Sequence, residues 1–343
     1  MRYRSLGRTG LMVSPLALGT FNFGGPTNAE DSRRIIRRAV EAGINFFDAA
    51  NGYNGGQSEE ILGSALRDHA DRDQVIVATK VFYPVGQGPN DRGGSRHHIL
   101  RECERSLKRL KVDHIDLYQL HRPDFEVDPE ETLSALNDLV RQGKVRYVGA
   151  STHPAWKVME ALGISRMRGW ARFVAEQPPY NLLDRRIENE LVPMCLEHGL
   201  GLIPYAPLAQ GVLAGRYTST QALPSDSRAI VRGKIYADRV NEPGIAVGRE
   251  VDRLARQAGM KASHLAMSWV KDRPGVTAPI FGPRTLEQLE DMLPVMDMDF
   301  PADLADAVDR LVPPGSAVTN FHNGCAWMRQ QLRWETAESV PAA

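Results

Sequence analysis

Four ionisable side chains stand at or just beyond the ends of short apolar runs in the sequence. Asp48 ends INFFD, Lys80 ends VIVATK and His121 ends IDLYQLH, while Tyr53 follows Asp48 by five residues. If these runs are parallel strands of one barrel, their carboxyl ends open at a single mouth, which is where such barrels hold their active sites. The spacing therefore predicts that the four side chains meet around one site.

The four side chain types suit the delivery of a proton to a carbonyl oxygen. A tyrosine has an ordinary pKa of about 10, and a neighbouring Lys80 ammonium is expected to lower the pKa of Tyr53. Asp48 would keep Lys80 charged, and His121 would orient the substrate oxygen. The set contains no Ser or Cys nucleophile with a base partner, which argues against acyl transfer. The carbonyl carbon needs a hydride that no side chain supplies, so a nicotinamide cofactor is expected.

The four residues belong to a chain in which eight short apolar runs alternate with amphipathic helical patterns. The runs cover residues 13–18, 44–48, 75–80, 115–121, 145–151, 173–177, 201–206 and 276–281. Strand–helix alternation implies parallel strands with right-handed crossovers, and eight units at about this length predict a (β/α)8 TIM barrel of the α/β class. The alternative is a doubly wound open sheet, but the sequence lacks the G-x-G-x-x-G turn of that fold.

Capping signals indicate where several helices begin. Thr27 with Glu30 and Thr285 with Gln288 follow the S/T-x-x-E/Q pattern of a capping box, and Asp128 precedes a proline at the first helical position. These signals predict helices after runs one, four and eight.

The composition excludes several classes of protein. The 343 residues carry 42 basic and 42 acidic side chains, a net charge of zero, and 42% are hydrophobic. Balanced charge disfavours nucleic-acid binding, and no stretch approaches the length of a membrane span. The three cysteines form no C-x-x-C pair, and the adjacent His97 and His98 would diverge on a helix, so no metal site is predicted. We expect a cytoplasmic protein. The oligomeric state, including a homo-oligomer, stays open.

Together with these four residues, longer segments make the sequence resemble the aldo-keto reductase family over roughly residues 1–295. The segments include YRSLGRTGLMVSPLALGT, GINFFDAANGY, VIVATK, DHIDLYQLHRPD, EQPPYNLL, IPYAPLAQGVLAGRY and PIFGPRTLEQLE. The resemblance implies a barrel that reduces carbonyls to alcohols with NADPH. It also implies a catalytic tetrad of Asp48, Tyr53, Lys80 and His121, with the tyrosine as general acid. The barrel is expected to span residues 1–297, with a C-terminal extension over residues 298–343 that packs on it.

The resemblance also implies a set of residues that bind NADP(H). They are Ser151, Gln177, Tyr205, Leu208, Gln210, Gly211, Arg216, Gly282, Arg284 and Gln288. In the family, the residues at the first two positions hold the carboxamide, and an aromatic residue at the third stacks on the nicotinamide ring. Independently, the helix start predicted beside Arg284 suits a 2′-phosphate, because helix N-termini and guanidinium groups both bind anions. This favours NADPH over NADH.

Three positions depart from the family pattern. Ala49 stands where Thr is usual, Thr152 where Asn is usual, and Met292 where an adenine-side Asn is usual. A threonine hydroxyl cannot reproduce both hydrogen-bonding groups of an amide, so no carboxamide role is assigned to Thr152.

The substrate and the direction of the reaction stay open. The segment PNDRGGSR after run three resembles the loop of a deoxysugar branch of the family, so a sugar-derived aldehyde or ketone is one candidate. The same residues could oxidise an alcohol. They also allow an NADP-binding oligomeric or regulatory subunit with slow turnover, or a lyase or isomerase with a Schiff base at Lys80. The aromatic residues Phe321, Trp327 and Trp334 suggest that the tail docks on the barrel, contacts another subunit or closes over the substrate.

Overall fold

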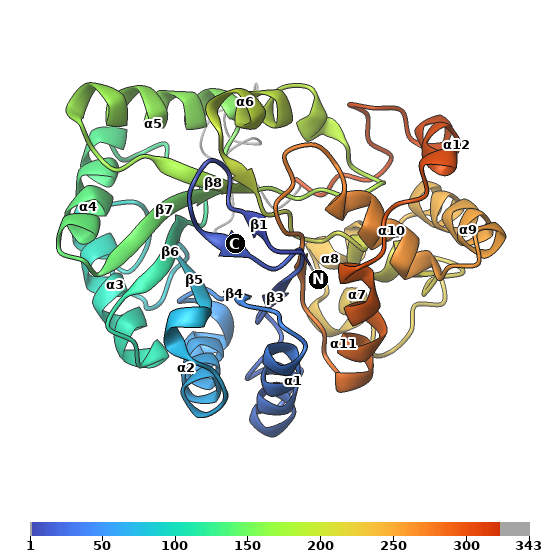
Figure 1. Ribbon diagram of the computed structural model, residues 1–343, viewed down its shortest axis with the longest axis horizontal. Helices are drawn as coiled ribbons and strands as arrows, with labels where there is room; N and C mark the ends of the chain where they lie inside the picture. Colours follow the sequence, from blue (N-terminus) through green and yellow to red (C-terminus); the bar gives the residue numbers. More distant parts are fainter. Residues whose placement is uncertain (1, 323–343) are drawn as a thin grey trace.

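The computed structural model describes residues 2–322, in which eight parallel strands curl into a barrel surrounded by helices (Figure 1). The strand order is β10-β3-β4-β5-β6-β7-β8-β9. The strands are β3 (Ala17–Gly19), β4 (Phe46–Asp48), β5 (Ile76–Val81), β6 (Ile115–Leu120), β7 (Val145–Ser151), β8 (Phe173–Gln177), β9 (Gly201–Leu202) and β10 (Ile280–Phe281). A parallel bridge between Leu202 and Val276 joins the two ends of this order. The predicted (β/α)8 TIM barrel is confirmed.

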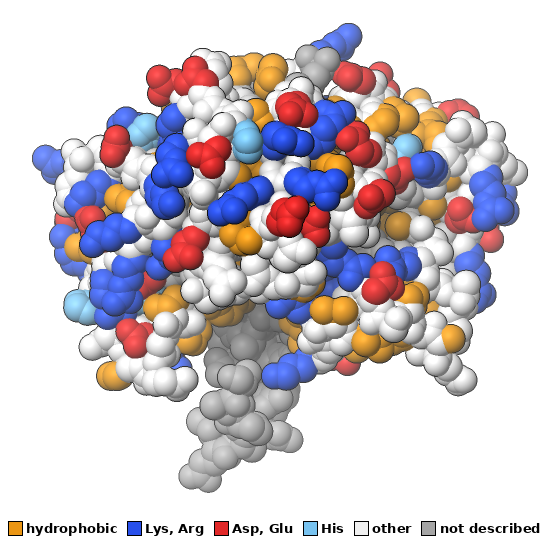
Figure 2. Space-filling view, turned by 90° about the horizontal axis from the view of Figure 1, so that it is seen from below, with side chains coloured by type: hydrophobic (Ala, Val, Ile, Leu, Met, Phe, Trp, Pro, Cys, Tyr) orange, Lys and Arg blue, Asp and Glu red, His pale blue; other side chains and the backbone are white. Residues whose placement is uncertain are grey.

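Helices follow the strands and cover the outside of the barrel (Figure 1). They are α1 (Ala29–Glu41), α2 (Gln57–His69), α3 (Arg96–Leu110), α4 (Pro129–Arg141), α5 (Ala155–Arg168), α6 (Leu191–His198), α7 (Arg228–Arg232), α8 (Ile235–Asp238), α9 (Glu242–Gln257), α10 (Ala262–Lys271), α11 (Leu286–Met292) and α12 (Ala305–Leu311). Among residues 2–322, no helix has both the length and the apolarity that a membrane crossing needs. On the face shown in Figure 2, acidic and basic side chains are interspersed.

The first predicted strand is two elements instead of one. Met12–Val13 form β2, which pairs in antiparallel fashion with β1 (Arg4–Ser5), and the barrel strand β3 begins only at Ala17. Pro15 separates them because proline cannot donate to a strand ladder. The hairpin packs its Leu6 and Val13 against apolar residues of the barrel interior. Because these contacts are made at the amino end of the strands, the other end is left to receive a ligand.

The last two predicted runs also form strands that are shorter than predicted, whereas β7 and β8 have the predicted bounds. After Leu202 the chain contains Pro204 and Pro207, and Pro279 precedes β10. These prolines remove donors from the ladder and confine each regular strand to two residues.

One of the predicted helix caps is wrong by one residue. Asn28, rather than Thr27, caps α1 and accepts a backbone N–H with its side chain. The Thr27 hydroxyl instead donates to the backbone oxygen of Arg284, 3.0 Å away, and so links α1 to the segment after β10. The caps predicted at Asp128 and Thr285 are present.

Apolar side chains fill two shells on either side of the strands. Phe46 and Leu117 lie in the cluster inside the barrel, and Phe47 and Tyr118 lie in the larger cluster between strands and helices. Neighbouring residues face opposite sides because strand side chains alternate. The predicted runs are nearly continuous in apolar residues because both faces of a parallel sheet are buried.

The described part of the C-terminal segment is anchored to the loop after β8. The buried Arg185 guanidinium donates to Asp309 (2.6 Å) and to the backbone oxygen of Val312 (2.7 Å). Phe321 is fully buried, and its backbone N–H donates to Asp184 (2.7 Å). The division of the chain at residue 297 stays a prediction, and Trp327 and Trp334 lie outside the described residues.

Candidate active site

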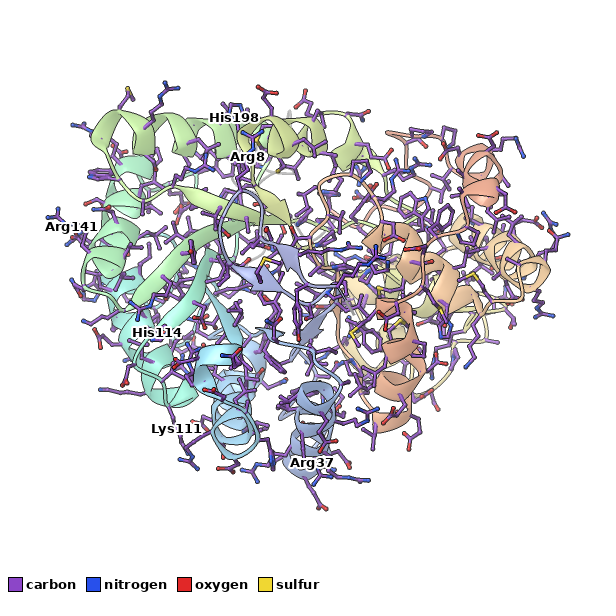
Figure 3. All side chains as sticks on the ribbon, viewed as in Figure 1. Arg8, Arg37, Lys111, His114, Arg141 and His198 are labelled. Atoms are coloured by element: carbon purple, nitrogen blue, oxygen red, sulfur yellow. The ribbon has the colours of Figure 1, made fainter. Side chains whose placement is uncertain are left out.

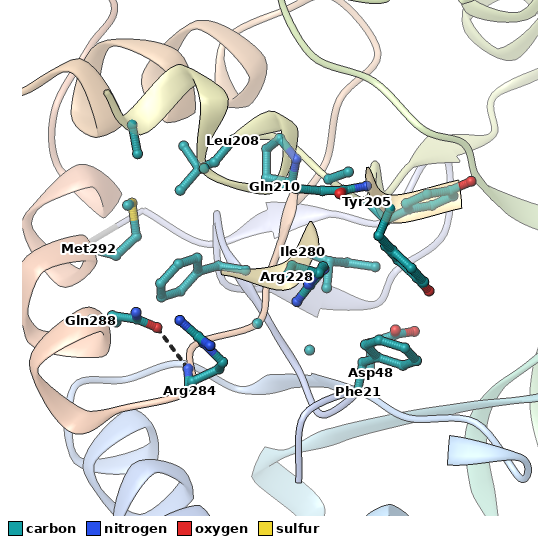
Figure 4. A pocket seen from close by; sticks show the side chains of 18 of the residues that line it. Phe21, Asp48, Tyr205, Leu208, Gln210, Arg228, Ile280, Arg284, Gln288 and Met292 are labelled. Atoms are coloured by element: carbon teal, nitrogen blue, oxygen red, sulfur yellow. Dashed lines mark hydrogen bonds between the residues drawn. The ribbon is translucent and has the colours of Figure 1, made fainter. Parts of the chain in front are cut away.

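A large cavity of about 900 Å³ opens at the carboxyl ends of the strands. This volume is near the top of the usual range for ligand pockets, about 300–1,000 Å³. The cavity is lined by all ten residues predicted to bind the cofactor: Ser151, Gln177, Tyr205, Leu208, Gln210, Gly211, Arg216, Gly282, Arg284 and Gln288. Asp48, Tyr53 and His121 line the same cavity. Figure 4 shows Arg284 and Gln288 at one end and Asp48 and Tyr205 at the other.

Strand alternation explains why polar residues of several strands face this cavity. Phe46, Ala78, Leu117 and Ala175 belong to the inner apolar cluster. Two residues beyond each of them the chain again faces the interior. Those positions are Asp48, Lys80, Gln119 and Gln177, and they form the polar top of the barrel interior.

Lys80 lies beneath the cavity and joins two of the other predicted residues. Its Nζ donates to Asp48 Oδ2 (2.6 Å), to the backbone oxygen of Ala49 (2.8 Å) and to the Tyr53 hydroxyl (3.3 Å). The Lys80 side chain is fully buried and does not line the cavity. Burial lowers the pKa of Lys80, and the carboxylate of Asp48 opposes that shift.

His121 completes the group from the end of β6. Its ring centre is 5.7 Å from that of Tyr53, with the two rings nearly perpendicular. Burial and the positive charges of Lys80 and Arg122 lower the pKa of His121 well below its ordinary value. The imidazole is therefore neutral near pH 7 and can donate a single ring N–H. The structure thus brings all four predicted side chains together.

The expected direction of the Tyr53 pKa shift is wrong. Lys80 is expected from the sequence to lower this pKa, but the structure raises it well above 10. Desolvation is the largest cause, the negative charge of Asp48 adds to it, and Arg122 opposes it. Burial penalises the tyrosinate more than the nearby cations stabilise it. Tyr53 is therefore a phenol at neutral pH, which is the form that donates a proton.

Two glutamines hold the Asp48 carboxylate together with Lys80. Gln177 Nε2 donates to Asp48 Oδ1 (2.9 Å), and Gln119 Nε2 donates to the same oxygen (3.3 Å). Gln119 also accepts from Gln177 (3.2 Å). Gln119 is absent from the residues predicted from the sequence. A cue for Gln119 was present in the sequence, because a polar residue that faces inward two positions before His121 is unusual in a buried strand.

A buried ionic network lies behind the loop that carries Tyr53. Glu59 accepts from the Thr79 hydroxyl (2.5 Å) and from Arg109 (2.6 Å), and it is fully buried. A Cβ at Gly56, in the Tyr53 loop, would come 2.8 Å from Arg109. The network therefore packs against the loop and against β5, the strand that carries Lys80. Sequence patterns did not identify it, because the three charged or polar partners come from separate elements.

Ala206 and Gln210, which line the cavity, and Thr152, which follows the lining residue Ser151, have left-handed backbone conformations that residues other than glycine rarely adopt. Thr152 has φ 58°, Ala206 58° and Gln210 60°. Such conformations cost about 1–3 kcal/mol each and cluster at functional sites. For Thr152 the cost is highest because a β-branched residue is most crowded there.

The far end of the cavity holds the group that could bind phosphates. Arg284 donates its backbone N–H to Gln288 Oε1 (2.8 Å), as the dashed line in Figure 4 shows. The Arg284 guanidinium contacts the Asp226 carboxylate (3.3 Å), and Arg216 pairs with the same carboxylate. Asp226 therefore bridges two of the arginines predicted to contact the cofactor.

Arg228 is a further cavity residue that was not predicted from the sequence. It lies on α7 and points into the cavity (Figure 4). Burial lowers its pKa, Tyr236 raises it, and the like charges of Arg232 and Arg284 lower it further. A guanidinium surrounded in this way favours an anionic ligand. One cue was present in the sequence, because Arg228 falls within residues 216–244, a long irregular stretch that follows β9.

The described cysteines are poorly suited to nucleophilic chemistry. Cys103 and Cys195 are both buried. Burial raises the pKa of Cys103 to about 12 and also raises the pKa of Cys195. Within residues 2–322, no three His, Cys, Asp or Glu side chains are grouped as metal ligands would be. His98 is buried on α3.

Comparisons with known proteins identify the family of the chain. The family model for the aldo/keto reductase family matches residues 15–313. The chain is 38% identical to an uncharacterized oxidoreductase, YrpG, of Bacillus subtilis, over 92% of this chain and 97% of that protein. It is 35% identical to L-glyceraldehyde 3-phosphate reductase of Escherichia coli, over 85% of this chain and 86% of the relative. It is also 36% identical to a probable voltage-gated potassium channel subunit beta of Oryza sativa, over 91% and 95%. The chain belongs to the aldo/keto reductase family.

Proposed function

We propose that this protein is an NADPH-dependent oxidoreductase that reduces an aldehyde or ketone to an alcohol, with Tyr53 as general acid. The observation that carries the proposal is the position of the Tyr53 hydroxyl, 3.3 Å from Lys80 Nζ, beside His121 and inside the large cavity. Family membership supports an oxidoreductase. The name L-glyceraldehyde 3-phosphate reductase supports reduction of a carbonyl group.

Each side chain of this group has its own role in proton delivery. Tyr53 gives its phenolic proton to the carbonyl oxygen as negative charge develops there. The neutral His121 donates a hydrogen bond to the same oxygen and fixes its direction. Lys80, held by Asp48, stabilises the tyrosinate that remains after transfer. Positioned proton transfer of this kind contributes about 10²–10⁴-fold to the rate.

The cavity fits a phosphorylated dinucleotide. When bound, reduced nicotinamide supplies the hydride that goes to the carbonyl carbon. Ser151 and Gln177 would hold its carboxamide and Tyr205 would stack on its ring. The Ser151 hydroxyl and the Gln177 amide are buried at the floor of the cavity. Leu208, Gln210 and Gly211 would border the pyrophosphate.

Cationic groups at the other end fit phosphates. Arg216 and Arg228 would meet the pyrophosphate, and Gly282, Arg284 and Gln288 would surround the adenosine. The guanidinium of Arg284 beside the start of α11 suits a 2′-phosphate. The proposal is therefore NADP(H) rather than NAD(H).

Turnover of the purified protein tests the proposal. Absorbance at the NADPH wavelength is followed with aldehydes, ketones and sugar-derived carbonyls, and the alcohol is quantified. We expect equal amounts of NADP⁺ and alcohol. Loss of NADPH absorbance without alcohol would contradict the proposal. Alcohol oxidation with NADP⁺ is assayed in parallel, because the same residues serve either direction.

A second candidate function is favoured by other relatives of the chain. Two probable voltage-gated potassium channel beta subunits, from Oryza sativa and Arabidopsis thaliana, are each 36% identical to it. The alternative is therefore an NADP-binding regulatory subunit with slow turnover, working in a homo-oligomer or a larger assembly. Tight NADPH binding with negligible turnover on every carbonyl would favour it. A cytoplasmic location is proposed for either function.

A further inference from the structure

Gln119 is a buried polar residue that the proton-transfer scheme does not use. It lies on β6, two residues before His121, and is fully buried. Its Nε2 donates to Asp48 Oδ1 (3.3 Å), and its Oε1 accepts from Gln177 Nε2 (3.2 Å). Asp48 belongs to the proposed tetrad, and Gln177 is a proposed cofactor residue. Gln119 therefore joins the reacting group to the proposed nicotinamide end of the cavity.

The Asp48 carboxylate determines how the two amides are turned. A carboxylate only accepts hydrogen bonds, so each amide must face it with its NH₂ group. Asp48 Oδ2 accepts from Lys80 Nζ (2.6 Å), and Oδ1 accepts from the Nε2 atoms of Gln119 (3.3 Å) and Gln177 (2.9 Å). Since the Gln119 nitrogen faces Asp48, its oxygen is the atom left to meet Gln177. The charge of Asp48 therefore sets the orientation of both side chains.

Both hydrogens of the Gln177 amide are committed by this arrangement. Its nitrogen carries two hydrogens, and it donates to Asp48 Oδ1 (2.9 Å) and to Gln119 Oε1 (3.2 Å). Gln177 also lines the cavity. The group that its amide offers a ligand there is therefore the carbonyl oxygen, which only accepts. A ligand N–H matches that oxygen, whereas a ligand carbonyl or carboxylate oxygen would leave it unpaired.

We propose that Gln119 is a positioning residue for the cofactor: it holds Gln177 as a hydrogen-bond acceptor alone, so that the site selects a nicotinamide ring carrying a carboxamide NH₂. The proposal rests on the proposed binding of NADP(H) at Gln177. Without Gln119, Asp48 would still accept one of the two hydrogens, but the other would be free to meet a ligand oxygen. Gln119 thus restricts Gln177 to one role at the cavity.

Three oxidised dinucleotides that differ at one group of the ring test the proposal. NADP⁺ carries a carboxamide. Its 3-acetylpyridine analogue keeps the oxygen and has a methyl group in place of NH₂, whereas its thionicotinamide analogue keeps NH₂ and has sulfur in place of the oxygen. Calorimetry gives the Kd of each without turnover. For the wild type we expect NADP⁺ and the thionicotinamide analogue to bind alike, and the acetylpyridine analogue to bind about 10-fold more weakly, the usual effect of one unpaired buried acceptor.

Gln119→Met keeps the length of the side chain and removes both of its hydrogen-bonding groups. We expect the ratio of the Kd for the acetylpyridine analogue to the Kd for NADP⁺ to fall from about 10 towards equality, because the released Gln177 N–H donates to the acetyl oxygen. A residue that only supports the fold would weaken all three ligands alike and leave the ratio unchanged. That result would overturn the role proposed for Gln119.

Gln142→Met is the matched control. Gln142 is exposed at the end of α4 and directly follows Arg141, which lies at the outer edge of the molecule (Figure 3). The same exchange is made there far from the cavity, so the wild-type ratio should be kept.

Binding and turnover together separate this role from the proposed function. If the wild type binds NADP⁺ and the acetylpyridine analogue equally, the role of Gln119 fails even where carbonyls are reduced. If the expected ratios are found but no carbonyl is reduced, the reductase assignment fails and the role of Gln119 stands. If none of the three binds, the NADP(H) proposal fails and the role of Gln119 fails with it. Gln119→Leu replaces Gln119→Met if the latter does not fold, and the wild-type ratio is decisive on its own against the proposal.

Discussion

The Nζ of Lys80 lies 3.3 Å from the Tyr53 hydroxyl, at the end of a side chain that is fully buried. The same nitrogen donates to Asp48 at 2.6 Å. The ammonium therefore has two tasks. It compensates the buried charge of Asp48, which bears on the stability of the fold. It also lies beside the phenol of Tyr53, which is the proposed proton donor. The two tasks can be separated by experiment.

Replacing Lys80 should destabilise the protein because Asp48 loses its cation. Removing one partner of a buried ion pair typically costs about 3–5 kcal/mol. We expect Lys80→Met to lower the free energy of unfolding, measured in urea, by that order. The double variant Asp48→Asn with Lys80→Met should be more stable than Lys80→Met alone, because no unpaired buried charge remains. A double variant that is as unstable as the sum of the two single variants would contradict this account of the pair.

The buried carboxyl of Glu176, next to Gln177, should make stability depend on pH. Glu176 is fully buried, and desolvation raises its pKa to about 8. In the unfolded chain the same group has a pKa near 4.5. Between these two values the folded state holds a proton that the unfolded state has lost, so this group makes stability fall as pH rises, by about 1.4 kcal/mol per pH unit.

The Glu176→Gln variant isolates that contribution. His153 has an opposite effect, because burial lowers its pKa from 6.5 to about 4, and its contribution to stability is lost as pH falls through this window. The clearest interval is therefore pH 6.5 to 8. There the difference in unfolding free energy between Glu176→Gln and wild type should rise steadily in favour of the variant. Glu197→Gln on the exposed face of α6 is the control and should show a constant difference.

Arg284 should distinguish the two nicotinamide dinucleotides. We expect Arg284→Ala to raise KM for NADPH about 10- to 100-fold, because a charge-assisted contact to the 2′-phosphate is lost. The KM for NADH should change little. Arg34→Ala, an exposed arginine of α1, removes a charge away from the cavity and should leave both values unchanged. Equal increases for both cofactors would refute a contact with the 2′-phosphate.

Strand positions were predictable from the sequence wherever the apolar run was uninterrupted. β7 and β8 have the predicted bounds, and the alternation that puts Phe46 inside the barrel also directs Asp48 inward. The first run was misread because Val13 and Ala17 are both apolar and buried, yet belong to different sheets. Local apolarity does not distinguish a hairpin that covers the barrel from a strand within it.

Contacts between elements that lie far apart in the sequence were harder to predict. The meeting of Asp48, Lys80 and Tyr53 could be predicted because the barrel brings all strand ends to one mouth. The shift of the Tyr53 pKa could not, because its sign depends on how deeply the hydroxyl is desolvated. The bond from Arg122 to Thr152, thirty residues apart, depends on side chain directions at two neighbouring strand ends. Periodicity gives those directions within a strand but not in the loop beyond it.

The most direct test of the account is the Tyr53→Phe variant, which removes one oxygen and keeps the ring. NADPH affinity is measured by fluorescence titration and kcat by NADPH absorbance, with Tyr147→Phe on β7 as the control. The account predicts unchanged NADPH affinity and a kcat lowered about 10²–10⁴-fold for Tyr53→Phe, with both values kept in the control. A Tyr53→Phe protein that binds NADPH and retains nearly wild-type kcat would contradict it.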